Sequence, residues 1–255
     1  MRVAMLGSGN VASHLSKALI RSGNPVLQVW SKTHQNAIKL ALEIGADSIV
    51  DLKEISNDVD LVIIAVADDA IAAVANLIQR KDWLVVHTSG STECAVLNQH
   101  PKYGVLYPLQ TFSKDVELDF SQVPLCIEAN NKETENSLLQ LGSTLSTNVR
   151  VINSLSRLNL HVAAVFACNF TNYLFSLSQN LLEKNDLSFD IIRPLIFETV
   201  KKIESNLPAD VQTGPAVRND RKTMQKHLER LQNEPEWQDL YRLISQSIVK
   251  KYQGS

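Results

Sequence analysis

The sequence predicts an α/β protein, in which a doubly wound parallel sheet is followed by an all-helical C-terminal domain. Two observations lead to this fold class. Up to about Arg150, short apolar runs alternate with helical stretches, and from Asn153 onward the strand-like runs stop. Strand–helix alternation is typical of a parallel sheet covered by helices. We therefore expect a sheet domain over residues 1–152 and a helical domain over residues 153–255.

Six apolar runs are the predicted strands of the first domain. The run DLVIIAV is apolar on both faces, as expected for a strand buried in a parallel sheet. The predicted strands cover residues 2–6, 26–30, 60–66, 83–87, 104–109 and 124–129. The helices predicted between them cover residues 10–23, 35–45, 69–80 and 132–145. In the second domain, one long helix over residues 156–185 precedes helices over 189–205, 218–232 and 236–252.

Composition favours a globular protein and argues against nucleic-acid-binding, disulfide-rich and membrane-spanning classes. The chain has 255 residues, 44% of them hydrophobic and 20% charged, with a formal net charge of −2, which favours a packed core over disorder. No basic run suggests a nucleic-acid surface. Three widely spaced cysteines form neither a disulfide ladder nor a zinc pattern. The start lacks a secretory segment, and no apolar run is judged long enough to span a bilayer, so we expect a cytoplasmic protein without membrane, metal or nucleic-acid partners.

A glycine turn follows the first predicted strand. Gly7, Gly9 and Ala12 have the spacing G-x-G-x-x-A, with a helix after them and a second strand about twenty residues on. Gly7 permits the tight turn, Gly9 lets a pyrophosphate approach, and Ala12 lets the helix pack closely. The phosphate would lie on the free N–H groups of the helix start, at Asn10, Val11 and Ala12. A glycine turn that serves only the fold is the alternative.

The end of the second strand indicates which dinucleotide binds. An NAD site usually places Asp or Glu there, whereas this chain has Ser31, Lys32 and Thr33. A cation with hydroxyl groups suits a 2′-phosphate, so we predict NADP. The alternative is that Lys32 is only a solvated surface charge.

Two further strand ends complete the predicted cofactor site. Small residues at Ala65, Val66 and Ala67 would leave room for the cofactor at the carboxyl edge of the sheet, where open α/β folds bind ligands. Thr88 and Ser89 belong to a polar cluster that would form a floor for the nicotinamide. A polar turn leading into a helix explains this cluster equally well. The acidic pair after Ala67 is most simply a helix N-cap.

The long helix carries a polar stripe. At about 100° per residue, its polar residues fall within an arc of about 120°. The stripe consists of Arg157, His161, Asn169, Asn172 and Ser176. On a helix whose other surface is apolar and expected to be buried, such a stripe would line a cleft. A stripe that faces solvent, or core amides satisfied by neighbours, are the alternatives.

The segment VQTGPAVRND, residues 211–220, interrupts the helical second half. A connector needs only the break at Gly214–Pro215, so the additional polar side chains suggest contact with a ligand. Arg218 offers a bidentate fork for a carboxylate or phosphate. Pairing of Arg218 with an acidic neighbour is the alternative. Asp220 is equally well explained as the N-cap of the next helix.

These segments together resemble a bacterial family over essentially the whole chain. The resemblance rests on MLGSGNVASHLSKAL, AVADDAI, VHTSGS, YPLQTFS, LHVAAVFACNFTNYL, PLIFET and QTGPAVRND. Members join a Rossmann-like NADP-binding domain to a C-terminal helical domain of unassigned function, and are similar to the deazaflavin-dependent NADP oxidoreductases. The layout more distantly resembles pyrroline-5-carboxylate reductase, prephenate dehydrogenase and the β-hydroxyacid dehydrogenases. The last of these use a helix lysine, which is absent here until Lys184.

The resemblance implies nucleotide binding in the first half and a helical half that often forms dimers, so we expect a homodimer held through residues after Asn153. Our first hypothesis is an NADP-dependent oxidoreductase for a small, anionic carbonyl or imine compound, or for a deazaflavin. His161 would donate or accept the proton, Asn169 would orient the substrate oxygen, and Arg218 would hold an anionic group. The alternatives are a nucleotide-binding sensor or scaffold without turnover, or a site for another nucleotide-containing metabolite.

Overall fold

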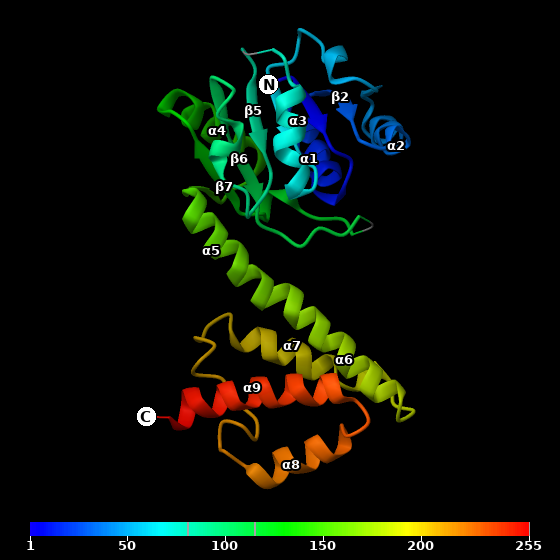
Figure 1. The fold of residues 1–255 in the computed structure, drawn as a ribbon, viewed down its shortest axis with the longest axis vertical. Coiled ribbons are helices and arrows are strands. Elements are labelled where there is room, and N and C mark those ends of the chain that lie inside the picture. The colour runs from blue at the N-terminus through cyan, green and yellow to red at the C-terminus, as the bar shows by residue number, and fades with distance from the viewer. Residues whose placement is uncertain (81, 115, 255) are drawn as a thin grey trace. The chain divides into compact units, whose positions relative to one another are not determined.

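The computed structural model describes residues 1–80, 82–114 and 116–254, and it divides into two compact units, Met1–Cys168 and Asn169–Ser255. The first unit contains an eight-stranded sheet in the order β3-β2-β1-β4-β5-β6-β7-β8. Figure 1 shows this sheet with the helices of the same unit around it. The strands are β1 (Val3–Leu6), β2 (Val26–Trp30), β3 (Asp47–Ile49), β4 (Leu61–Ile64), β5 (Leu84–His87), β6 (Lys102–Pro108), β7 (Leu125–Ala129) and β8 (Val149–Val151). The predicted fold class is confirmed.

Six of the seven strand pairs are parallel, and one differs from the prediction. β6 and β7 pair antiparallel, with Tyr107 opposite Cys126. In its described residues, the connection between these two strands contains only a short 3-10 helix (Phe120–Gln122) and no α-helical crossover, which antiparallel pairing allows. The carboxyl ends of β1, β2, β4, β5 and β6 therefore share one edge of the sheet.

Alternate residues of the central strands face two apolar layers. The helices of the first unit include α1 (Asn10–Arg21), α2 (His34–Ile44), α3 (Ile71–Leu77) and α4 (Lys132–Leu145). Val3 and Met5 pack in one cluster with α1, α2 and α4, whereas Ala4 and Leu6 pack in another with α3. Both faces of the sheet are thus buried, which explains why its strands lack polar alternation.

Two strands and the unit boundary differ from the sequence prediction. β3 and β8 have only three residues each and lie at the two ends of the sheet order, so neither leaves a long apolar run. All described strands precede Asn153, as expected. The compact units divide after Cys168, and the start of the long helix belongs to the first unit, where Ser154 and Arg157 bond to Glu128 of the sheet.

The long helix is present but is not a regular α-helix. It consists of α5 (Ser154–Ala164), a π-helical segment (Val165–Phe170) and α6 (Thr171–Glu183). The wider turn of a π-segment shifts the residues that follow it relative to a uniform 100° progression. The calculated stripe assumed a uniform helix, so its extension to Asn172 and Ser176 in the second unit stays a prediction, whereas Arg157 and His161 lie one turn apart on α5.

The second unit contains α7 (Arg193–Lys202), α8 (Arg221–Arg230) and α9 (Pro235–Gln253) besides α6. The expectation that the apolar surface of the long helix is buried is wrong for the single chain. Exposed large apolar side chains of the long helix include Leu155, Val162, Phe166, Phe170 and Tyr173.

One helical stretch, Ser154–Glu183, is long and apolar enough to cross a membrane by length and composition alone, with a mean hydropathy of 1.3 over its most apolar window. This finding corrects the expectation that no such run exists. It is weak evidence for a membrane, because core helices of soluble proteins pass the same test. The first turns of this helix are moreover bound to the sheet through Arg157.

Candidate active site

The glycine turn lies at the carboxyl end of β1, as predicted. Gly7 has a φ of +134°, and a Cβ atom placed there would lie 2.0 Å from the carbonyl oxygen of Ala65, so only glycine fits. Gly9 has an ordinary backbone conformation, and a Cβ atom there would meet nothing within 4 Å. The space in front of Gly9 is therefore open, as close approach of a pyrophosphate requires.

The first turn of α1 suits an anion. The first N–H groups of a helix have no intrahelical acceptor, and no acidic side chain lies in this turn. The Asn10 side chain does not point to a ligand here, because it donates to the Phe112 carbonyl at 2.8 Å, and His14 Nε2 contacts the Ser113 carbonyl at 3.0 Å. Asn10 can thus reach a phosphate through its backbone N–H group, beside Val11 and Ala12.

The end of β2 lies beside the glycine turn. Gly7 N donates to the Trp30 carbonyl at 2.8 Å, and the Ser8 hydroxyl donates to the Ser31 hydroxyl oxygen at 2.9 Å. Lys32 and Thr33 follow and are both exposed. A cation and two hydroxyl groups are thus gathered at the position where Rossmann-like folds bind the adenosine ribose.

The end of β4 provides the predicted small residues next to the turn. Ala65 and Val66 are partly exposed and Ala67 is exposed. The expected N-cap at the following acidic pair is wrong, since neither short helix that begins there has a side-chain cap. Asp68 instead accepts a hydrogen bond from the Ser91 hydroxyl, which links the loops after β4 and β5.

The loop after β5 is buried and held by His87. The Ser89 N–H group donates to His87 Nδ1 at 3.1 Å, and His87 Nε2 lies 3.4 Å from the Glu93 carbonyl. Burial, with a contribution from the Arg157 cation, lowers the pKa of His87 from 6.5 to about 4, so this ring is neutral at physiological pH. Thr88 and Ser89 are buried too, and their contact with the cofactor stays a prediction.

His161 contacts the end of β6. Its Nδ1 lies 3.1 Å from the Tyr107 hydroxyl, and the two rings meet edge to face with centroids 6.1 Å apart. Both rings rest on Gly90, where a Cβ atom would lie 2.7 Å from His161 Nδ1 and 2.8 Å from Tyr107 Cζ. The strands and helix of the first unit therefore bring His161 to the carboxyl edge that also carries the glycine turn.

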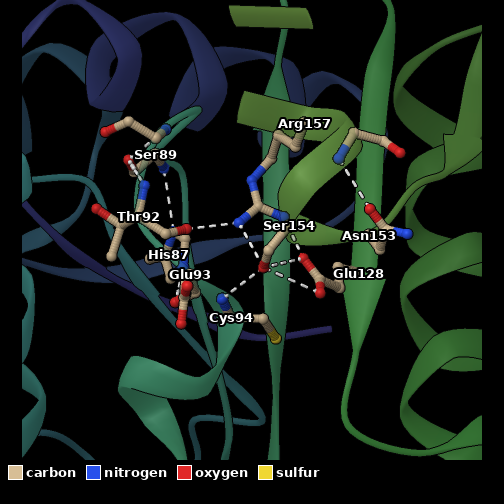
Figure 2. Close-up of polar contacts among 11 residues, drawn as sticks. His87, Ser89, Thr92, Glu93, Cys94, Glu128, Asn153, Ser154 and Arg157 are labelled. Atoms are coloured by element: carbon tan, nitrogen blue, oxygen red, sulfur yellow. Dashed lines mark hydrogen bonds and ion pairs between the residues drawn. The ribbon is translucent and has the colours of Figure 1, made fainter. Parts of the chain in front are cut away.

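A buried ion pair ties α5 to the sheet (Figure 2). Arg157 Nη1 donates to Glu128 at the end of β7, and Nη2 donates to the Thr92 carbonyl. The Ser154 hydroxyl bonds to Glu128 Oε2 at 2.8 Å and accepts from Cys94 N at 3.0 Å. This network fixes both the start of α5, which carries His161 one turn after Arg157, and the segment that follows Gly90.

The two other predicted catalytic residues lie in the second unit. Asn169, in the π-helical segment, is exposed, and so is Arg218, in the loop between α7 and α8. A joint site of these residues with His161 stays a prediction.

The loop of residues 211–220 is held by a glycine turn and by hydrogen bonds to α8 and α9. Gly214 has a φ of +110°, and the Val217 carbonyl accepts from the Gln253 side chain at 2.6 Å. Asp220 caps α8, accepting from Thr223 N at 3.1 Å, which confirms the N-cap alternative. The Thr223 hydroxyl also donates to this carboxylate and lowers its pKa.

Among the described residues, no group of three or more histidine, cysteine or acidic side chains is arranged to hold a metal ion, and the three cysteines are free. Sequence reasoning missed Tyr107 and Glu128 as parts of this region and placed Arg157 on a stripe without a role. One signal was present for Glu128, a lone carboxylate at the end of an otherwise apolar strand.

Known proteins match both halves of the chain. Residues 2–90 match the family described as coenzyme F420-dependent NADP oxidoreductase, and residues 123–248 match a domain of unknown function (DUF2520). No match to a curated protein was found. Among solved structures, the "putative NADP oxidoreductase BF3122" of Bacteroides fragilis is 42% identical with a TM-score of 0.92, and the alignment covers 98% of each chain.

Two more distant structures share the fold. Protein TM1727 of Thermotoga maritima is 20% identical, with a TM-score of 0.73, over 99% of this chain and 98% of that one. A reductive aminase of Aspergillus terreus, crystallised with NADPH and ethyl-5-oxohexanoate, is 13% identical, with a TM-score of 0.73, over 98% and 94%. The predicted cofactor, NADP, is confirmed as that of the family matched by the N-terminal half. The chain belongs to the same NADP oxidoreductase family as the Bacteroides fragilis protein.

Proposed function

We propose that the protein transfers a hydride between NADP and a small, anionic carbonyl or imine compound, with a deazaflavin as the other candidate hydride partner. One observation carries the proposal. Along a single sheet edge, the open glycine turn of Gly9 is followed by small residues after β4, a buried polar loop after β5, and the Tyr107–His161 pair beside β6. This is the edge at which open α/β folds bind their ligands.

In the cofactor half of the site, separate groups of residues would bind the pyrophosphate, the 2′-phosphate and the rest of the cofactor. The N–H groups of Asn10, Val11 and Ala12 would hold the pyrophosphate at the helix start. Ser31, Lys32 and Thr33 would bind the ribose 2′-phosphate, with Lys32 as the cation. When bound, the nicotinamide supplies the hydride chemistry. Ala65–Ala67 and Thr88–Ser89 would border the remainder of the cofactor along the edge.

The substrate half would begin at His161. Its imidazole can donate or accept a proton at a substrate carbonyl oxygen or imine nitrogen. Asn169 would orient that atom, and Arg218 would bind an anionic group by a bidentate contact. The reductive aminase crystallised with NADPH and a keto ester supports the carbonyl part of this proposal by analogy of fold, whereas the anionic group rests on Arg218 alone.

The decisive experiment follows the nicotinamide absorbance of the purified protein with NADPH and a panel of keto acids, imines and a deazaflavin. Turnover that His161→Ala abolishes, while calorimetry still detects NADPH binding, is the expected result. Tight NADPH binding with no turnover on any compound would instead indicate a sensor or scaffold. Lack of NADPH binding would overturn the proposal and leave another nucleotide-containing metabolite as the ligand.

We also propose that the protein is a cytoplasmic homodimer. Exposed apolar residues gather on the long helix, such as Phe166 and Tyr173, and on α7, such as Leu195 and Phe197. Surfaces of this kind mark protein–protein interfaces in soluble proteins. Light scattering should give twice the chain mass at micromolar concentration, and Phe166→Glu should shift the protein to monomer. A monomeric wild type, or recovery of the protein with membranes, would contradict this assembly.

A further inference from the structure

Tyr107 and His161 form a closely packed pair joined by one hydrogen bond. Tyr107 is 8% exposed, and among the described residues its hydroxyl has a single hydrogen-bond partner, His161 Nδ1 at 3.1 Å. Both rings also pack directly on Gly90, where even a Cβ atom would lie less than 3 Å from each of them. The two side chains are therefore held together by packing as well as by the hydrogen bond.

The direction of this bond follows from the burial of the phenol. A buried hydroxyl needs an acceptor for its proton, and Nδ1 is the acceptor that the geometry provides. Burial raises the pKa of Tyr107 to about 12, so the phenol keeps its proton at physiological pH. If Nδ1–H donated instead, the Tyr107 proton would lack its partner. In the neutral imidazole the ring proton then resides on Nε2.

We propose that Tyr107 is a positioning residue that holds neutral His161 as the Nε2–H tautomer, so that His161 meets the substrate as a hydrogen-bond donor. If the proposed function holds, the substrate atom that contacts His161 must be a hydrogen-bond acceptor, such as a carbonyl oxygen or an imine nitrogen. Only this consequence rests on the proposed function. A neutral imidazole in this state polarises a carbonyl. In the imidazolium, Nδ1–H donates to the Tyr107 oxygen, so Nε2 carries a proton in both charge states.

The first test needs no substrate. Ring-nitrogen NMR of isotope-labelled histidine distinguishes the two neutral tautomers, and His161→Gln identifies the signal. At alkaline pH, wild type and the control Tyr103→Phe, on the same strand, should show the Nε2–H form. Tyr107→Phe keeps the ring packing, removes the hydroxyl and should give a mixture of tautomers. An Nδ1–H form in wild type, or no change in Tyr107→Phe, would overturn the proposal.

The second test uses turnover once a substrate is found. Tyr107→Phe should lower kcat about tenfold, the usual effect of one lost hydrogen bond, and leave NADPH affinity unchanged. Unchanged kcat would contradict the positioning role. The two proposals fail separately, because the tautomer is measured in the absence of turnover. A wild type with the Nε2–H form but no activity would refute only the proposed function.

Discussion

Arg157 donates from Nη1 to Glu128 Oε2 and thereby joins the first turns of α5 to the end of β7. The two partners differ in burial, because the Arg157 side chain is 1% exposed and the Glu128 side chain is 19% exposed. A buried charge that loses its partner stays desolvated, whereas a partly exposed one regains water. The structure therefore predicts an asymmetry between the two possible ways of breaking the pair.

Glu128→Gln should cost more stability than Arg157→Met. The first variant leaves a fully buried guanidinium without its counter-charge, which we expect to cost about 3 kcal/mol. The second leaves a carboxylate that water can reach, and we expect about 1–2 kcal/mol. Glu133→Gln breaks the exposed pair with Lys102 and serves as control, with a loss below about 1 kcal/mol. Urea denaturation measures the three free energies of unfolding, and equal losses would contradict the argument.

His87 should make the sheet domain less stable in mild acid. Burial lowers its pKa to about 4 from 6.5, so between these pH values the unfolded chain binds a proton that the folded chain does not. The free energy of unfolding therefore falls as pH decreases from 6.5 toward 4, by up to about 3 kcal/mol, and the effect is absent above neutral pH.

The matched variants for this pH effect are His87→Asn and His227→Gln. Asparagine retains an acceptor for the Ser89 N–H group but does not titrate, so the acid slope should flatten. His227 lies on α8, outside the sheet, and its replacement controls for the loss of one histidine. Identical slopes in all three proteins would show that His87 does not cause the loss.

The sequence predicted the sheet well because its signals are local. Runs such as residues 60–66 and the spacing of Gly7 and Gly9 can be read without knowing any distant contact. β3 and β8 were missed because three residues at a sheet end bury too little to leave a pattern. The π-helical segment was missed because helix arithmetic assumes a uniform turn.

The candidate site was only partly predictable, because its contacts join residues that lie far apart in the sequence. His161 stood out as a histidine on an apolar helix, but its partner Tyr107 lies 54 residues earlier in an ordinary strand. Such a contact depends on the tertiary path of α5 and leaves no trace in local pattern. The polar loop after β5 showed its composition in the sequence, but its burial and the role of His87 follow from the fold.

Gly9→Asp should abolish dinucleotide binding in a folded protein. The backbone of Gly9 is ordinary and the adjacent space is open, so the new side chain causes no internal clash. It would instead fill the pyrophosphate position and repel it, and we expect a loss of at least about 100-fold in NADPH affinity. Gly7→Ala is the contrasting variant, because its Cβ would clash with Ala65 and should destabilise the fold. Calorimetry that detects normal affinity in folded Gly9→Asp would refute the turn as the binding site.

Lys32→Asp should discriminate between the two nicotinamide cofactors. Only NADPH carries the 2′-phosphate, so charge reversal at the end of β2 should weaken NADPH by roughly 10- to 100-fold and NADH by less than about threefold. Lys39→Asp, an exposed charge reversal on the neighbouring helix α2, controls for the change in net charge. Equal losses for both cofactors in calorimetric titrations would mean that Lys32 does not bind the ribose phosphate.

Arg218→Ala should impair substrate handling and leave NADPH binding intact. The glycine turn belongs to the first unit, whereas Arg218 is an exposed residue of the second, in a loop whose Val217 carbonyl accepts a hydrogen bond from the Gln253 side chain. A desolvated bidentate contact with an anion contributes roughly 1.5–3 kcal/mol, so apparent substrate affinity should fall about 10- to 150-fold. Arg218→Lys should recover part of the loss, because a point charge cannot reproduce the fork.

The control variant for Arg218 is Lys222→Ala, which removes another exposed cation from the first turn of α8. It should leave both KM and the melting temperature unchanged. A purely structural role of Arg218 predicts the opposite pattern, a lower melting temperature with unaltered substrate and cofactor affinity. The comparison therefore decides whether Arg218 binds substrate or only stabilises the loop at 211–220. The start of α8 does not need Arg218, because Asp220 already caps that helix.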